Sequence, residues 1–256
     1  MNTDLSNNTV LKVENLSKNC GGLQILNGLT FSIGSGERRA VIGPNGAGKT
    51  TLFNVITGEM PASGGQISFY GENITGLPNY KRARRGIART FQKNNLFWDL
   101  TVLDNLVLVL QLKNDHANNW YRNRSPKVFP HLYQEADNLL EKWGLAERRN
   151  RLIKELSYGE QRQMEILLGL AQNPKLLLLD EPTAGISNVE TQHIFKLLHT
   201  LPSDITILII EHDLELVFGL ADSVTVLYYG KVLAEGTPDE IRKDSRVREV
   251  YLGVEG

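Results

Sequence analysis

The sequence has little that would place the protein in an oxidising compartment or within a membrane. Cys20 is its single cysteine, so an internal disulfide is excluded. Apolar runs such as Leu176–Leu179 are far shorter than the roughly 20 residues needed to span a bilayer. The opening segment MNTDLSNNTV lacks the basic and apolar regions of a secretory signal. We therefore expect a protein that reaches a membrane only through a partner.

The sequence also lacks an excess of charge of one sign. Its 28 Lys+Arg residues nearly balance its 29 Asp+Glu residues, so no overall field attracts nucleic acid. One basic cluster remains, and because charge runs are usually solvated, we expect its side chains to face water. Its members are Lys81, Arg82, Arg84, Arg85 and Arg89.

Short β-branched runs alternate with helical patterns, which predicts an α/β fold with a mainly parallel core sheet. Hairpin-like segments in the N-terminal third predict an additional antiparallel β subdomain. From about Val102 to Gln172 the pattern is helical, broken by a polar stretch at Lys113–Pro130. We expect a single domain, with a core of 1–92 and 173–256 and a helical subdomain inserted at about 93–172. Strands are expected at Val10–Val13, Arg39–Ile42, Ile67–Phe69, Leu176–Asp180, Ile205–Ile210 and Val224–Tyr228.

A glycine-rich segment between a predicted strand and a predicted helix fits the phosphate-binding pattern G-x-x-x-x-G-K-[ST]. Its glycines let backbone N–H groups turn towards phosphate oxygens, and the following helix start adds positive potential. Lys49 is expected to reach the β- and γ-phosphates, and the Thr50 hydroxyl to bind Mg²⁺. The alternative, a turn with an accidental lysine, is disfavoured by the flanking elements. The predicted phosphate site comprises Gly43, Pro44, Asn45, Gly46, Ala47, Gly48, Lys49, Thr50 and Thr51.

A second candidate site follows the apolar run Leu176–Leu179, which is typical of a parallel strand buried on both faces. The run ends in Asp180 and Glu181, at the end of the strand where open α/β sheets bind ligands. Asp180 is expected to hold Mg²⁺, and Glu181 to polarise an attacking water. An acidic pair alone is as often a solvated turn, but the upstream phosphate loop favours the site.

The segment Leu156-Ser157-Tyr158-Gly159-Glu160-Gln161 opens a helix that runs to Asn173-Pro174. Ser157 and Glu160 have the spacing of a capping box, which starts a helix by satisfying its free N–H groups. A capped helix start beside glycine is also a site for anions. Both interpretations can hold for the same residues.

Together these motifs resemble the nucleotide-binding domain of ABC transporters, with the signature LSGGQ present as LSYGEQ. Arg89-Thr90-Phe91-Gln92 resembles the Q-loop, and Ala184-Gly185-Ile186-Ser187 lies where the D-loop belongs. His212, after Ile205–Ile210, matches the switch histidine that contacts the γ-phosphate. The resemblance covers essentially the whole chain.

The resemblance implies a P-loop NTPase fold, ATP and Mg²⁺ as cofactors, and ATP hydrolysis coupled to transport. In this family each ATP is buried between two chains, so the partner is a second copy of this chain or a paralogue. Transmembrane permease subunits hold the dimer at the cytoplasmic face of the membrane, and a solute-binding protein acts through them. The implied roles are catalytic for Glu181, His212 and Gln92, metal-binding for Thr50, Gln92 and Asp180, and nucleotide-binding in trans for Ser157, Gly159 and Glu160.

Several features resemble the subgroup that serves branched-chain and polar amino acid uptake. They are Arg89–Gln92, the insertion around Trp120–Tyr133, Gly236-Thr237-Pro238 and Val250–Gly253. Relatives in urea uptake and lipopolysaccharide export share some of them and stay alternatives. A soluble ABC ATPase acting on ribosomes or DNA is a further alternative, disfavoured by the single cassette and the absence of a basic stripe.

Two positions depart from the family pattern. Cys20 stands where members carry an aromatic residue that stacks on adenine, which predicts weak ATP binding with little preference for adenine. Ser187 stands at the last D-loop position, where the family has Asp or Asn. Leu96, Phe97 and Trp98 after the Q-loop are expected to form an exposed apolar patch at the permease contact, or to pack the subdomain hinge.

Overall fold

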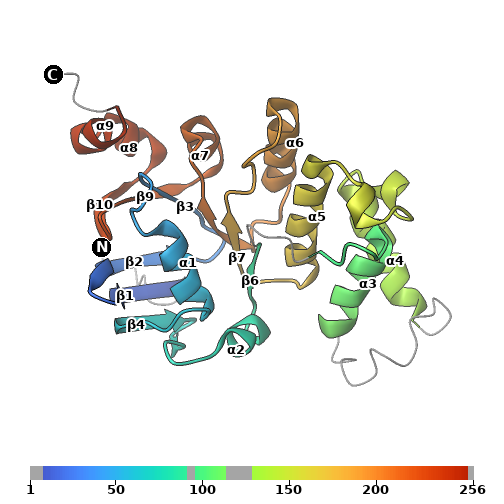
Figure 1. Cartoon of the computed structure of the whole chain (residues 1–256), viewed down its shortest axis with the longest axis horizontal. Helices are drawn as coiled ribbons and strands as arrows, with labels where there is room; N and C mark the ends of the chain where they lie inside the picture. The colour runs from blue at the N-terminus through green and yellow to red at the C-terminus, as the bar shows by residue number, and fades with distance from the viewer. Residues whose placement is uncertain (1–7, 91–95, 114–128, 253–256) are drawn as a thin grey trace. The chain divides into compact units, whose positions relative to one another are not determined.

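Residues 8–90, 96–113 and 129–252 are described by the computed structural model of the chain (Figure 1). The chain divides into two compact units. The core unit comprises Met1–Arg89, Lys175–Glu181 and His199–Gly256, and the helical unit comprises Thr90–Pro174 and Pro182–Leu198.

The core unit contains a six-stranded sheet in the order β10-β9-β3-β8-β7-β6. All neighbouring pairs are parallel except β9 with β10, so the expected mainly parallel sheet is confirmed. Every residue of β7 and β8 is buried, as expected for central parallel strands covered on both faces. The strands are β3 (Arg38–Ile42), β6 (Ile87–Arg89), β7 (Leu176–Asp180), β8 (Thr206–Ile210), β9 (Ser223–Tyr228) and β10 (Lys231–Gly236).

A second, antiparallel sheet has the order β2-β1-β4-β5, which confirms the expected β subdomain. Its strands are β1 (Thr9–Cys20), β2 (Leu23–Gly34), β4 (Gly64–Phe69) and β5 (Glu72–Asn73). The prediction ended the first strand at Val13, whereas β1 continues to Cys20. Register shifts after Val13 and Leu16 interrupt the regular alternation of buried and exposed residues, which is why the sequence pattern did not reveal the extension.

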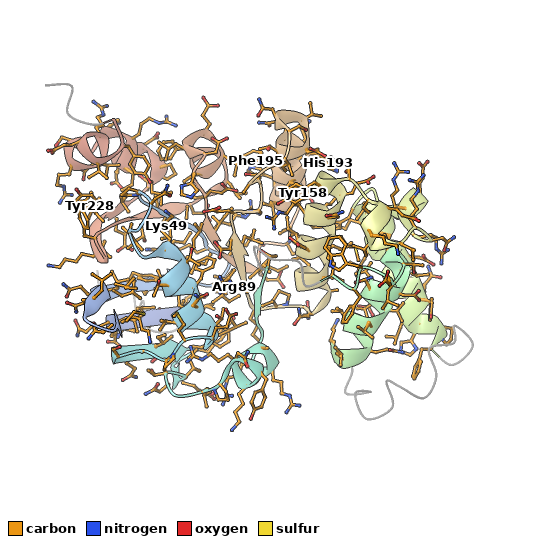
Figure 2. All side chains as sticks on the ribbon, viewed as in Figure 1. Lys49, Arg89, Tyr158, His193, Phe195 and Tyr228 are labelled. Atoms are coloured by element: carbon orange, nitrogen blue, oxygen red, sulfur yellow. The ribbon has the colours of Figure 1, made fainter. Side chains whose placement is uncertain are left out.

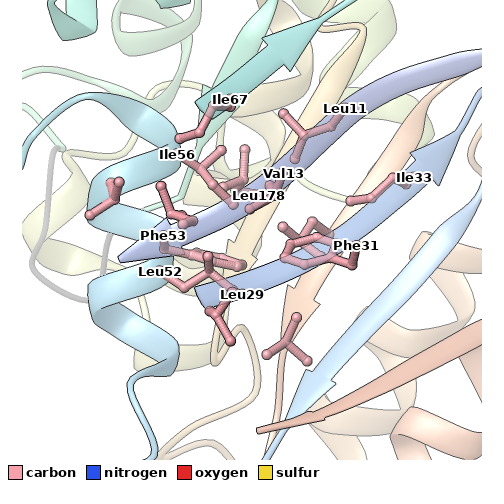
Figure 3. Close-up of a cluster of buried hydrophobic side chains, with 14 of the residues drawn as sticks. Leu11, Val13, Leu29, Phe31, Ile33, Leu52, Phe53, Ile56, Ile67 and Leu178 are labelled. Carbon is pink, nitrogen blue, oxygen red and sulfur yellow. The ribbon is translucent and has the colours of Figure 1, made fainter. Parts of the chain in front are cut away.

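Between the two sheets lies a hydrophobic cluster around α1 (Lys49–Thr57), shown in Figure 3. Leu52, Phe53 and Ile56 of α1 meet side chains of β1, β2 and β4 on one side. Leu178 and Leu208 come from the parallel sheet. Burial of apolar surface at about 25 cal/mol per Å² makes this cluster the main source of stability for the helix that follows the phosphate loop.

The remaining helices of the core unit are α2 (Asn79–Arg84), α7 (Leu214–Leu220), α8 (Pro238–Lys243) and α9 (Ser245–Leu252). The helical unit contains α3 (Val102–Lys113), α4 (Pro130–Lys142), α5 (Tyr158–Ala171) and nearly all of α6 (Asn188–His199). Residues 182–198, which the sequence analysis assigned to the core, group with the helical unit, because Glu190 and His193 contact α5. Among the helices of these described segments, none combines the length and the apolar character needed to cross a bilayer.

The expectation that the basic cluster faces water is wrong for Arg82, which is only 1% exposed. Its guanidinium donates to the carbonyls of Val55 (2.8 Å) and Ile56 (2.7 Å), in the last turn of α1. It also donates to Leu77 (2.9 Å) and Thr75 (2.8 Å). The Val55 carbonyl also accepts the Gly58 N–H at 3.3 Å, and a cation at this helix end suits the helix dipole. Burial lowers the pKa of Arg82, but an arginine stays charged.

Arg82→Ala should therefore remove the guanidinium that the carbonyls of Ile56, Thr75 and Leu77 share, and lower the free energy of unfolding by roughly 2–4 kcal/mol. Arg84→Ala, on the exposed face of the same helix, should change it by less than about 0.5 kcal/mol. Urea titrations of the two variants measure the difference. Equal stability of the two would show that water replaces the guanidinium without cost.

Candidate functional site

The candidate site lies where three neighbouring parallel strands of the core unit end. Strand β8 lies between β3 and β7, and Ile210 pairs with Val41 of β3 and with Asp180 of β7. The segments that follow these strands therefore emerge at one edge of the sheet. They are the predicted phosphate loop, the acidic pair, and the segment that contains His212. This edge is where open α/β sheets bind ligands.

The phosphate loop has the backbone that the pattern requires. Gly43 has a φ of 152°, and a Cβ added there would lie 2.2 Å from the carbonyl oxygen of Leu227, so a side chain is excluded. The ammonium of Lys49 donates to the carbonyls of Gly43 (2.7 Å) and Pro44 (3.2 Å). Burial lowers the pKa of Lys49, while the charges of Glu181 and Asp180 oppose that shift. Without a ligand, Lys49 is thus held by its own loop.

Asp180 is held by Arg89, a member of the basic cluster that was expected to be exposed to solvent. Arg89, labelled with Lys49 in Figure 2, donates to the Asp180 carboxylate at 2.7 Å and to the Asn54 amide oxygen at 2.6 Å. It also forms an ion pair with Glu59 at 3.1 Å. Burial raises the pKa of Asp180, and the hydrogen bond and charge of Arg89 work against that rise. The local sequence pattern gave no signal for this contact, because Arg89 and Asp180 meet only through the pairing of β6 with β7.

Glu181 and His212 lie side by side. The His212 Nε2 atom is 2.6 Å from the Glu181 Oε1 atom. Glu181 has a left-handed backbone, with a φ of 48°, and its N–H donates to the Ile210 carbonyl at 2.9 Å. Such a conformation costs a non-glycine residue about 1–3 kcal/mol and is common at functional sites. It turns the Glu181 carboxylate out of the strand, so that Glu181 and His212 both line one cavity.

This cavity has a volume of about 560 Å³, within the range of small-molecule sites. The predicted residues from Asn45 to Thr51 line it, together with Glu181 and His212. Cys20, at the end of β1, does not, so its predicted contact with the base finds no support in the cavity. Four residues that the sequence analysis did not single out complete the lining: Leu23, Gln24, Ile25 and Tyr229.

The side chains fit the predicted Mg²⁺ ion. Thr50 offers a hydroxyl on the cavity wall. Asp180 is buried and does not line the cavity, but its carboxylate accepts a bond from Arg89 at the same sheet edge, and a cation could take the place of that guanidinium. Mg²⁺ typically takes one or two such oxygen ligands and completes its shell with phosphate and water. The third predicted ligand, Gln92, lies outside the described residues.

The signature segment belongs to the helical unit and contributes nothing to the lining of the cavity as described. Ser157 accepts the Glu160 N–H (3.2 Å), and the Glu160 carboxylate accepts the Ser157 N–H (2.9 Å), so the predicted capping box is confirmed. Arg148 donates to Glu160 at 2.7 Å. Burial alone raises the pKa of Glu160, but the bonds from Arg148 and Ser157 outweigh it and lower this pKa.

Glu190 lies against Gly159 at the start of the signature helix. A Cβ added to Gly159 would be 2.1 Å from the Glu190 Oε1 atom. The Glu190 carboxylate also accepts the N–H (2.9 Å) and hydroxyl (2.8 Å) of Ser187, and the Ser187 hydroxyl accepts the Glu190 N–H (3.3 Å). Bonds from the Ser187 N–H and hydroxyl, then from Gly159, lower the pKa of Glu190. Ser187 therefore caps α6, a role that Ser, Asp and Asn fill equally well.

The predicted apolar patch after the Q-loop is smaller than expected. Leu96 is buried, Trp98 is half-buried, and Phe97 is 51% exposed. The side chain of Asn105 holds Phe97 by accepting its N–H at 2.9 Å and donating to its carbonyl at 3.1 Å. Phe97 is thus the member of the three that remains available to a partner.

These features define a P-loop nucleotide-binding cassette. The glycine-rich loop with Lys49, the oxygen ligands Thr50 and Asp180, and the Glu181–His212 pair all belong to one edge of the sheet. The chain belongs to the ABC transporter family, which it matches over residues 26–184. Residues 231–256 additionally match the branched-chain amino acid ATP-binding cassette transporter family.

Curated relatives and solved structures agree with this assignment. The chain is 39% identical to the high-affinity branched-chain amino acid transport ATP-binding protein BraF of Pseudomonas aeruginosa, over 95% of this chain and 98% of BraF. It is 35% identical to the lipopolysaccharide export system ATP-binding protein LptB of Escherichia coli, over 95% and 97%. An ATP-binding cassette of an ABC transporter in its ADP conformation matches with a TM-score of 0.82, at 32% identity over 96% of this chain and 99% of that one.

Lys49→Ala should weaken MgATP binding by about 10- to 100-fold, since it removes charge-assisted bonds of about 1.5–3 kcal/mol to the phosphates. Lys18→Ala is a matched control, because Lys18 also donates to a backbone carbonyl, that of Pro61 (2.8 Å), but does not line the cavity. Equilibrium titration with MgATP compares them. Equal MgATP affinities of the two variants would show that Lys49 does not bind the phosphates.

Proposed function

We propose that this chain binds and hydrolyses MgATP as one half of a two-chain ATP sandwich. The observation that carries the proposal is the single cavity that brings together Lys49, Glu181 and His212. A cation for phosphates, a carboxylate and its histidine partner are what hydrolytic phosphoryl transfer needs in one place. Membership of the ABC transporter family supports ATP hydrolysis as the reaction.

Each side chain has a proposed task. Lys49 leaves the carbonyls of Gly43 and Pro44 to bind the β- and γ-phosphates. Glu181 accepts a hydrogen bond from the attacking water and orients it, and His212 contacts the γ-phosphate beside it. Thr50 and Asp180 would hold Mg²⁺, which when bound would neutralise charge on the phosphates. Gln92 is proposed as a further contact to the metal and the water.

The second chain of the sandwich supplies Ser157, Gly159 and Glu160. These signature residues start a helix whose N–H groups suit a phosphate. A second copy or a paralogue that presents the same helix start would complete the site. The proposal follows from the family resemblance.

We infer that the dimer energises import of branched-chain or other amino acids through permease subunits fed by a solute-binding protein. The match of residues 231–256 to the branched-chain amino acid cassettes and the 39% identity to BraF support this substrate class. Lipopolysaccharide export is the second candidate, supported by the 35% identity to LptB. In either case the chain is proposed to work at the cytoplasmic face of the membrane, bound through the permeases.

Glu181→Gln should retain MgATP binding and lose roughly 10²–10⁴-fold in turnover, the range for a general base. Because the amide keeps the size and the hydrogen bond to His212, the empty cavity should keep its shape. ATP should also trap this variant as a dimer, because the sandwich is proposed to open only after hydrolysis. Turnover is measured by phosphate release, and the dimer by sedimentation with and without MgATP. Glu72→Gln, at an exposed carboxylate of the same unit, should hydrolyse like the parent. Near-parental turnover in Glu181→Gln, with no dimer in ATP, would contradict the proposal.

Phe97→Ala should reduce coupled uptake of labelled leucine while the basal ATPase rate of the isolated subunit stays within about 2-fold, because exposed side chains contribute little to stability. Leu112→Ala, also exposed in the helical unit, is the control. Uptake is measured in cells or vesicles that contain the complete transporter. Normal uptake with Phe97→Ala would remove this residue from the permease contact, and a defect in lipopolysaccharide export instead would favour the second candidate.

A further inference from the structure

Two large apolar side chains remain exposed on the wall of the nucleotide cavity. Tyr229 is 77% exposed and Leu23 is 69% exposed, and both line the cavity together with the phosphate loop. Exposed apolar groups beside a ligand cavity mark a surface that a ligand covers. Neither residue belongs to the motifs that bind phosphate, metal or water.

The backbone holds Tyr229 at a fixed place beside the phosphate loop. Tyr228 pairs with Lys231, so Tyr229 and Gly230 form a two-residue turn between β9 and β10. The Gly230 N–H donates to the carbonyl of Ala47 in the phosphate loop at 3.1 Å. The Gly230 carbonyl accepts the N–H of Asn27 at 2.8 Å, which ties the same turn to β2.

Close packing also prevents the turn from moving away. A Cβ added to Gly230 would lie 2.2 Å from the carbonyl oxygen of Ile25, itself a lining residue. The ring of Tyr228 meets the ring of Tyr229 edge to face, with centroids 4.4 Å apart and planes at 67°. Figure 2 labels Tyr228 and Lys49 in this part of the core unit. The backbone of Tyr229 is therefore held beside the phosphate loop, and the Tyr228 ring contacts its side chain.

A second turn of the same kind shows which property distinguishes Tyr229. Tyr70 and Gly71 also form a two-residue turn with positive φ (49° and 78°, against 44° and 73° for Tyr229 and Gly230). Tyr70 likewise meets a preceding aromatic ring, that of Phe69, edge to face at 4.9 Å. Its own ring lies 5.0 Å from the ammonium of Lys175, and it does not line the cavity. The turn conformation is therefore shared, and the place on the cavity wall is particular to Tyr229.

We propose that Tyr229, together with Leu23, forms the platform on which the nucleotide base lies, the role that Cys20 cannot fill. The inference rests on the proposed ATP function and adds the residue that holds the base. An exposed phenol ring offers a flat π-face, and Leu23 adds apolar contact for the same ligand. The ring stacks on any base, so it strengthens binding of MgATP and MgGTP alike.

Titration calorimetry of the full chain with MgATP, MgGTP and magnesium tripolyphosphate tests the proposal. Tyr229→Ala should weaken both nucleotides by about 5- to 150-fold, the range for loss of one stacked base. Its affinity for tripolyphosphate, which has no base, should stay within about 2-fold of the parent. Tyr229→Phe should bind all three ligands like the parent, because it retains the ring.

Two controls complete the design. Tyr70→Ala removes the ring from the matched turn, and Cys20→Ala removes the thiol at the family's aromatic position. Both should bind MgATP like the parent. Parental MgATP affinity in Tyr229→Ala, or a loss in Tyr229→Ala that tripolyphosphate shares equally, would overturn the platform. A parent chain that binds neither MgATP nor tripolyphosphate would instead overturn the proposed ATP function itself.

Discussion

The whole site depends on the parallel alignment of β3, β8 and β7. Because Ile210 pairs with Val41 on one side and Asp180 on the other, the three strands end at the same level. Phosphate loop, carboxylates and histidine thereby meet without any long loop to position them. The buried apolar residues of these strands are what hold the alignment, so the hydrophobic cluster around α1 supports the chemistry as directly as it supports stability.

Three charged groups at the site have partners within the chain. Lys49 is bound by loop carbonyls, Asp180 by Arg89, and Glu181 by His212. In the proposed MgATP site, phosphates and metal would take the place of these partners, so that no buried charge is left unpaired. Side chains that are already held by such bonds would lose less entropy when a nucleotide binds.

Local sequence patterns predicted the features that depend on residues adjacent in the sequence. The phosphate loop, the acidic pair, the capping box and the strands depend on short runs, and the structure has them at or near the predicted bounds except for β1, which continues to Cys20. Arg82 and Arg89 were wrongly placed in water, because their partners lie on other elements of the sheet and helix layers. Tyr229 was missed for the same reason, since sheet order brings a turn more than 170 residues downstream onto the phosphate loop. Gln92 stays a prediction, outside the described residues.

One carboxylate, that of Glu190, serves two helix starts at once. It caps α6 through Ser187 and lies against Gly159, where the signature helix begins. An anion that approaches the signature N–H groups has to compete with Glu190, and displacing this side chain also removes a bond from the start of α6. The two events are thermodynamically linked. A change that weakens the α6 cap would strengthen anion binding at the signature helix, and a bound anion would weaken the cap by the same free energy. The D-loop and the signature are thus coupled within one chain through a single side chain.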